Sequence, residues 1–235
     1  GRVFPGSVII EGDLEIRFPL RILGDVEVRG GLVRSDLEVM GSLFVRDGII
    51  NHGRAPVRAG GVLSAAFLDR ASVMADTVHL RRYALQSRIL ASSAILALGS
   101  GVSIAGGQAH SCLRVDAAAL GSANSMETEV AVGLPALNTS FQTLYQSWAD
   151  ALTDANPPDE AAAKELRVAA NRWQKAARTT FSIDLSSVGI RAQKVHGGEG
   201  IRIGNASREI GNGCGPVTFS YEKIGERDRV AMARQ

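Results

Sequence analysis

The feature that most constrains this 235-residue chain is a short phrase that recurs between residues 7 and 120. Each copy is one or two small residues followed by an apolar–any–apolar triplet. Successive copies start about sixteen residues apart on average, a period typical of one coil of a β-solenoid. Clear copies begin at Gly12, Gly24 and Gly41, and looser copies at Gly60, Asp76, Ser92 and Gly106.

Apolar and polar residues alternate inside the phrase, as in Val26/Val28 and Leu43/Val45. Alternation sends successive side chains to opposite faces of a short strand. One coil cannot bury its own inner face, so coils must stack. We therefore expect Val26 and Val45 to point into the core of a parallel solenoid, with right-handed crossovers. The alternative is an ordinary β-sandwich with turns every 8–12 residues or so.

The period changes at Leu134, where two helical patterns begin. Pro135 suits the first turn of a helix, and Asn156 followed by Pro157 suits the start of a second helix. The spacing predicts two helices of about 18–20 residues that form an antiparallel hairpin. Their apolar seams are Leu134, Leu137, Phe141, Leu144, Trp148 and Ala151 in the first helix, and Ala162, Leu166, Ala169, Trp173 and Ala176 in the second.

The hairpin either projects as an arm or packs flat on the solenoid. We expect a projecting arm, with the hairpin and the solenoid burying separate cores. Trp148 falls in the seam, which predicts its burial.

Strand patterns return after Arg178, at Phe181/Ile183/Leu185, Ile190/Ala192, Ile201/Ile203 and Val217/Phe219/Tyr221. The fold class is thus mainly β with a helical insertion. We divide the chain into a right-handed parallel β-helix (1–132), an antiparallel helical hairpin (133–179) and C-terminal strands that rejoin and cap the β-helix (180–235). Gln108, His110 and Ser111 replace apolar residues in what we interpret as the last coil. Because the chain begins inside a running repeat, without Met, we also expect further sequence upstream.

Composition excludes several classes of protein. The net charge of +2 is far below the positive charge that is typical of a nucleic-acid-binding domain. No apolar run is long enough to predict membrane insertion. Cys112 and Cys214 form no CxxC pattern, so we expect reduced structural thiols in a cytoplasmic protein.

We find no motif for catalysis, a cofactor or a metal. The four histidines are dispersed and form no HExxH pattern. Asp25, Asp36, Asp47 and Asp76 together with arginines could mimic the acidic groove of a β-helical polysaccharide lyase, but aspartate at a Gly–Asp corner more commonly caps a turn. We expect no catalytic residue, no cofactor and no metal.

Four segments, taken in order, resemble the flagellar assembly protein A family of bacteria. They are the repeated Gly–Asp phrase, Ala119–Ser122 running into Thr128–Gly133 and a Pro-initiated helix, the helical hairpin, and Ile190–Gly204 followed by Pro216–Phe219. The resemblance implies a right-handed parallel β-helix with an inserted coiled-coil arm, acting in flagellar assembly through partners. Family members usually have Asp before the helix proline, whereas Leu134 precedes Pro135 here, so we expect no side-chain cap.

Our first hypothesis is a non-catalytic scaffold or adaptor that binds another protein. Its candidate contacts are Asp154, Asn156 and Asp159 at the hairpin tip, and Tyr145 and Trp148 if they lie outside the seam. The alternative is a self-assembling structural protein that forms a homo-oligomer or polymer, and a polysaccharide-acting enzyme is a distant third.

Overall fold

The computed structural model describes residues 2–16, 18–52, 56–124, 127–154, 160–179, 183–224 and 227–234. The first coils contain β1 (Arg2–Phe4), β2 (Val8–Ile10), β3 (Leu14–Glu15), β4 (Leu20–Ile22), β5 (Val26–Val28), β6 (Leu32–Val33), β7 (Leu37–Val39), β8 (Leu43–Val45), β9 (Gly48–Ile50), β10 (Val57–Ala59) and β11 (Val62–Asp69). There follow β12 (Ser72–Ala97), β13 (Ser103–Ser111), β14 (Arg114–Leu120), β15 (Thr128–Val132), α1 (Pro135–Thr153), α2 (Glu160–Thr179), a 3-10 turn η1 (Leu185–Ser187), β16 (Gly189–Val195), β17 (Glu199–Ile203), β18 (Ala206–Ile210), β19 (Val217–Ile224) and β20 (Arg227–Arg234).

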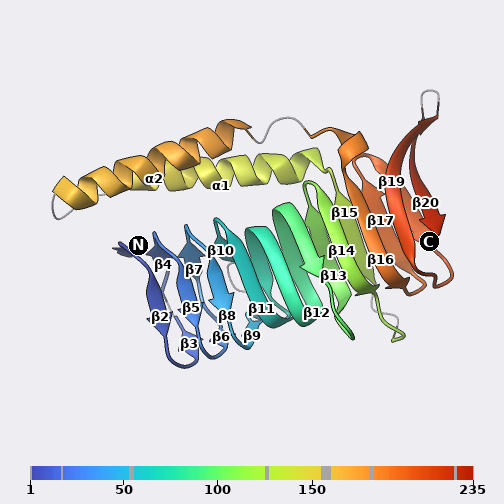
Figure 1. Cartoon of the computed structure of the whole chain (residues 1–235), viewed down its shortest axis with the longest axis horizontal. Coiled ribbons are helices and arrows are strands. Elements are labelled where there is room, and N and C mark those ends of the chain that lie inside the picture. The colour runs from blue at the N-terminus through green and yellow to red at the C-terminus, as the bar shows by residue number, and fades with distance from the viewer. Residues whose placement is uncertain are drawn as a thin grey trace.

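Parallel strands of successive coils stack into three faces of a solenoid (Figure 1). The first face is β1–β4–β7–β10, the second is β2–β5–β8–β11, and the third begins with β3–β6–β9. The long strand β12 then pairs with both β10 and β11. The predicted parallel β-solenoid is therefore confirmed.

The register stacks apolar residues of successive coils on one another. On the second face Val26 pairs with Leu43, Leu43 with Leu63, and Leu63 with Val78. All four side chains are fully buried. Val45 is also buried, whereas its neighbour Phe44 is 46% exposed. The prediction that Val26 and Val45 point into the core is confirmed, because strand alternation holds in each coil.

The small residues form two corner columns, so the copies of the repeat that begin at Gly12 and Gly24 do not each start a coil, contrary to our prediction. In the first column the Gly24 N–H donates to the Gly6 carbonyl at 3.0 Å, and the Gly41 N–H donates to the Gly24 carbonyl at 3.2 Å. Gly12 belongs to the second column, where Gly30 stacks on it so closely that a Cβ on Gly30 would lie 2.6 Å from the Gly12 carbonyl carbon. The repeated motif therefore occurs twice in each early coil, because two of the three corners are tight. Gly24 and Gly30 are thus successive corners of one coil, whereas Gly12 and Gly24 belong to different columns.

Gln108 and His110 do not mark the end of the solenoid, contrary to our expectation. Ala109, between them, is fully buried, and both polar side chains lie on the outer face beside Glu129. Strand β13 pairs with β15, and β15 pairs with β17. The coils therefore continue through this segment.

The chain returns to the solenoid after the hairpin, where β16 pairs in parallel with β14. Strands β18, β19 and β20 then pair antiparallel with β17, β16 and β19 respectively. The strand predicted at Phe181/Ile183/Leu185 is wrong where the structure describes it, since Leu185 begins η1. Asp184 accepts the Ser186 N–H at 2.9 Å and so favours a tight turn over an extended strand. Phe181 lies outside the described residues.

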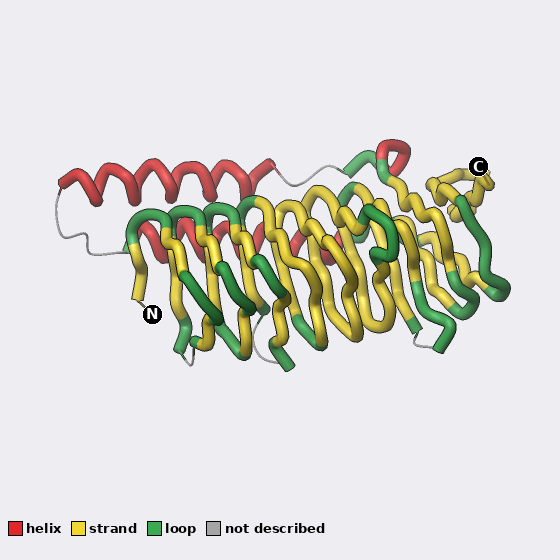
Figure 2. Tube along the Cα trace, turned by 60° about the horizontal axis from the view of Figure 1, so that its bottom comes forward, coloured by secondary structure: helices red, strands yellow, loops and turns green. Residues whose placement is uncertain are grey.

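The hairpin packs flat along the solenoid, so the projecting arm that we expected is wrong (Figures 1 and 2). Helix α1 begins two residues after Gly133 and runs back toward the N-terminal coils, and α2 returns beside it. At 1.5 Å per residue α1 is ~28 Å long, or about six coil spacings of ~4.8 Å. This length lets one helix cross most of the stack.

The hairpin and the solenoid also share a core, which corrects the expectation of separate cores. Met40, Met74, Leu90 and Cys112 of the solenoid are buried in one cluster with residues of both helices. This second contact explains why the buried face of the helices is wider than the predicted seams. Buried residues outside those seams are Asn138, Tyr145, Ala149, Leu152, Ala170 and Ala177.

Candidate protein-interaction surface on the helical hairpin

An aromatic cluster holds the two helices together. The rings of Trp148 and Trp173 meet edge to face, with centroids 4.8 Å apart. Tyr145 lies 5.1 Å from Trp173 and 5.9 Å from Phe141, measured between ring centroids. Such pairs contribute about 0.5–1.5 kcal/mol beyond their buried area. Trp148 is fully buried, as predicted, and Tyr145 is buried as well, so neither is available as an anchor for a partner.

Trp173 also fixes α2 on the first corner column. Its ring lies over Gly60 so closely that any Cβ there would clash with the ring and with the Met40 carbonyl oxygen. Glycine is required at this position because the backbone and the indole approach each other.

A chain of hydroxyl groups ties α1 to the same column. The Tyr145 hydroxyl donates to Ser92 Oγ at 3.0 Å, and Ser92 Oγ donates to Asp76 Oδ1 at 2.7 Å. Ser93 Oγ donates to the same carboxylate oxygen at 2.6 Å. Burial raises the pKa of Tyr145 to about 12, so the phenol stays protonated at neutral pH and keeps its donor role.

Cys112 lies beneath the hairpin and is a free thiol. Burial, followed by the charge of Asp76, raises its pKa to about 12. Reactive cysteines have depressed pKa values and exposed sulfur atoms. Cys112 therefore serves as a packing residue between the hairpin and the solenoid. Cys214 is also a free thiol.

Of the predicted tip contacts, the structure describes Asp154 alone, while Asn156 and Asp159 lie outside the described residues. Asp154 is exposed and caps α1 through its backbone N–H, which donates to the Asp150 carbonyl at 2.9 Å. At the other end of α1 the N-cap is Leu134 with no side-chain hydrogen bond, as predicted.

The outward faces of the two helices differ in charge. Helix α1 presents mainly small polar side chains, and its single residue that is charged at neutral pH is Asp150. Helix α2 has five basic and two acidic residues, a net charge of +3. The chain as a whole carries +2, so all other residues together carry −1. The basic face of α2 could have been predicted from the sequence, because most of its basic residues lie away from the predicted seam. We had instead placed the candidate contacts at the tip of the hairpin.

Four of these cations have no counter-charge: Lys164, Arg167, Arg172 and Arg178 form no ion pair with any residue that the structure describes. Arg172 instead lies over the Trp173 ring, 5.0 Å from its centroid. All four are exposed.

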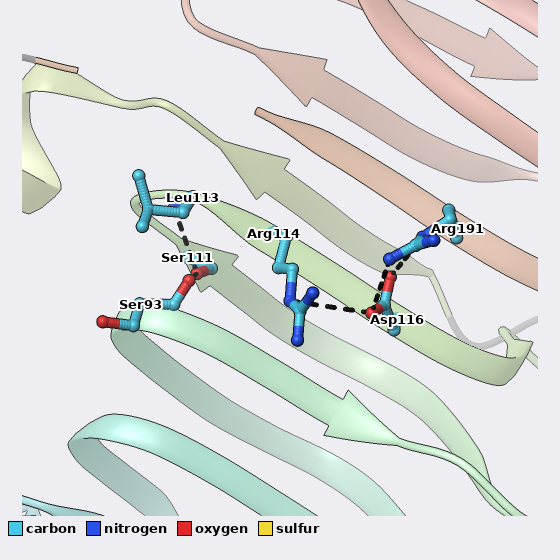
Figure 3. A network of polar contacts seen from close by, with 6 residues as sticks. All are labelled: Ser93, Ser111, Leu113, Arg114, Asp116 and Arg191. Atoms are coloured by element: carbon cyan, nitrogen blue, oxygen red, sulfur yellow. Dashed lines mark hydrogen bonds and ion pairs between the residues drawn. The ribbon is translucent and has the colours of Figure 1, made fainter. Parts of the chain in front are cut away.

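Many solenoid arginines, by contrast, are paired between coils. Glu38 accepts from Arg21 at 2.6 Å on one side and from Arg58 at 2.8 Å on the other. Figure 3 shows a related arrangement further along the stack, where Asp116 pairs with Arg191 of the neighbouring coil and with Arg114 of its own strand. The solenoid arginines that form ion pairs are Arg21, Arg29, Arg34, Arg58, Arg70, Arg114, Arg191 and Arg202.

Aspartates at the corners hold coils together. Asp25 Oδ1 accepts the Ser42 N–H of the next coil at 2.7 Å, and Asp13 Oδ1 accepts the Gly31 N–H at 2.6 Å. The aspartate thus bonds to the following coil rather than to its own turn. Asp25 and Asp76 are already engaged by donors of the next coil, which gives these two a structural role.

No group of three metal-ligating side chains comes together among the residues that the structure describes. Within the same residues, neither helix combines the length and apolar character needed to cross a membrane.

Together these features define a class of protein: a parallel β-solenoid with a helical hairpin laid along one corner. The chain belongs to the family described as the flagellar assembly protein A beta solenoid domain, whose family model matches residues 3–180. The resemblance read from the sequence is thereby confirmed. The family description links the chain to flagellar assembly and names no reaction. Searches of curated proteins and of solved structures found no match.

Proposed function

We propose that this protein is a non-catalytic scaffold of the bacterial cytoplasm that supports flagellar assembly, or its regulation, by binding another protein. The observation that carries the proposal is the two-sided hairpin. Its inner face packs on the solenoid, where Trp173 contacts Gly60 and Tyr145 donates a hydrogen bond to Ser92. The outer side of α2 presents cations that form no ion pair with the described residues. A rigid support under an exposed charged helix is suited to binding.

The proposal is tested in the bacterium that encodes the protein. Deletion of the gene should reduce swimming and the number of flagella seen by electron microscopy, and the wild-type gene should restore both. A deletion strain with normal flagella and motility would contradict the proposed function. An immunoblot checks that the complemented strain expresses the protein.

A further inference from the structure

A groove runs between α2 and the first corner column of the solenoid. Its volume is about 530 Å³. The solenoid side consists of Leu23 and Met40, and the helix contributes Val168, Ala169 and Trp173 among others. Val168 is 64% exposed, which is high for an apolar side chain beside a groove.

The rim of this groove is mainly basic. Lys164 and Arg172 line it, together with Glu165. Lys164, Val168 and Arg172 follow one another at intervals of four residues, so they lie along one side of α2. The two cations are ~12 Å apart along the helix axis, with the valine between them.

We propose that this groove binds an amphipathic helix of another protein that carries acidic residues on both sides of an apolar residue. The apolar side chain of the partner lies against Val168 and Leu23, and the flanking carboxylates pair with Lys164 and Arg172. On the partner helix the two acidic residues are separated by about seven or eight positions, which matches the spacing of the cations. The proposal rests on the proposed function and names the kind of partner.

Charge complementarity supports an acidic partner. The two rim cations lack a counter-charge among the described residues, while eight solenoid arginines are paired. An exposed ion pair contributes little to folding. It does steer association and select among partners, so cations without a partner on a supported helix fit a binding role.

The shape of the site favours a helix over a bilayer or a nucleic acid. Leu23 and Met40 form the solenoid side of the groove, and Met40 is buried, so a flat membrane surface cannot reach it. A nucleic-acid backbone would match the cations but would leave the apolar lining without a partner. An amphipathic helix in a groove satisfies both the apolar and the basic groups.

Fluorescence anisotropy with a designed peptide tests the proposal on the full chain. The probe is a fluorescein-labelled, Ala-rich helix of roughly 22 residues, long enough to be helical in water, with Glu, Leu and Glu four residues apart. A second peptide has Lys in place of both Glu residues. The variant pair is Lys164→Glu/Arg172→Glu in the groove and Arg167→Glu/Arg178→Glu outside it. Both double variants change the net charge equally and substitute exposed residues.

The Glu peptide should bind the wild-type chain saturably, and K164E/R172E should weaken binding about tenfold or more. R167E/R178E should change the affinity less than about threefold, because its charges lie outside the groove. The Lys peptide should bind K164E/R172E better than it binds the wild type. Val168→Ser should also weaken binding of the Glu peptide. Circular dichroism and tryptophan fluorescence check that each variant is folded.

Three results would overturn the proposal. The first is the absence of saturable binding of the Glu peptide. The second is an equal loss of affinity in the two double variants. The third is tighter binding of anionic phosphatidylglycerol vesicles or of duplex DNA than of the peptide, with the same dependence on Lys164 and Arg172.

Failure of the groove and failure of the proposed function give different results. If gene deletion abolishes flagella but the peptide does not bind, the groove proposal is wrong and the flagellar function stands. If the peptide binds as expected but deletion leaves flagella normal, the groove is a binding site and the flagellar function is wrong.

Discussion

The indole of Trp173 lies directly on the backbone of Gly60, 113 positions earlier in the chain, with no room for a Cβ between them. This contact joins the second helix of the insertion to a corner of the fourth coil.

Substituting Gly60 by Ala should therefore displace the hairpin. The added methyl group would clash with the Trp173 ring and with the Met40 carbonyl, and overpacking of this kind costs about 1–3 kcal/mol. Urea unfolding followed by tryptophan fluorescence measures the loss. Gly12→Ala is the matched control, since nothing lies within 4 Å of a Cβ at Gly12. Equal stability of the two variants would show that Trp173 does not rest on Gly60.

Removing the Tyr145 hydroxyl should weaken the attachment of α1. The hydrogen bond to Ser92 is partly buried under the hairpin, so Tyr145→Phe should cost about 1 kcal/mol of the free energy of unfolding. A double-mutant cycle with Ser92→Ala should show a coupling of about 0.5 kcal/mol or more. Tyr221→Phe is the control, because that hydroxyl is exposed. Strict additivity in the cycle would contradict the contact.

Stability should decline in alkaline solution because of Cys112 and Tyr145. Both groups have a folded-state pKa raised to about 12, so folding favours their neutral forms. Their contribution to stability is complete below their unfolded pKa values, about 9 for Cys and 10 for Tyr, and is lost as the pH rises toward 12. Urea unfolding between pH 7 and 10.5 should show a steeper decline for the wild type than for Cys112→Ala. Cys214→Ala controls for loss of a thiol, and identical profiles for wild type and Cys112→Ala would refute the effect.

Adjacent residues of β8 should respond in opposite ways to the same substitution. Val45→Asp places an unpaired charge in the stacked core, costs several kcal/mol and should abolish folding. Phe44→Asp adds the same charge on the outer face, where Phe44 is 46% exposed, and should leave a folded chain. Far-UV circular dichroism and size-exclusion chromatography separate these outcomes. Two folded variants, or two unfolded ones, would contradict the register.

Replacing residues 134–178 by a short Gly-Ser linker should destabilise the solenoid. The deletion uncovers Met40, Met74, Leu90 and Cys112, and each apolar side chain that becomes exposed costs about 1–2 kcal/mol. The shortened chain should bind the dye ANS and aggregate, and its midpoint of thermal unfolding should fall. Adding Met74→Gln and Leu90→Gln to the same deletion should reduce aggregation. An unchanged midpoint after deletion would restore the view that the two parts have separate cores.

Local pattern predicted the solenoid, its inward residues and the two helices, because period and alternation are properties of neighbouring residues. Val26, Val45 and Trp148 were assigned to buried faces on that basis alone. The corner columns were misjudged because Gly12 and Gly24 are each followed by the pattern Asp–apolar–Glu–apolar, and the sequence does not show which glycine stacks on which. The basic face of α2 was readable from the sequence, yet its importance depended on knowing which cations lack a partner.

Side-chain periodicity thus specifies the kinds of element and the face that each one buries. Tertiary structure decided where the hairpin lies. A helix of ~28 Å can project from a corner or return along about six coils with the same internal seam. The choice depends on groups far apart in sequence, such as Gly60 with Trp173 and Ser92 with Tyr145, that meet only after the coils have stacked.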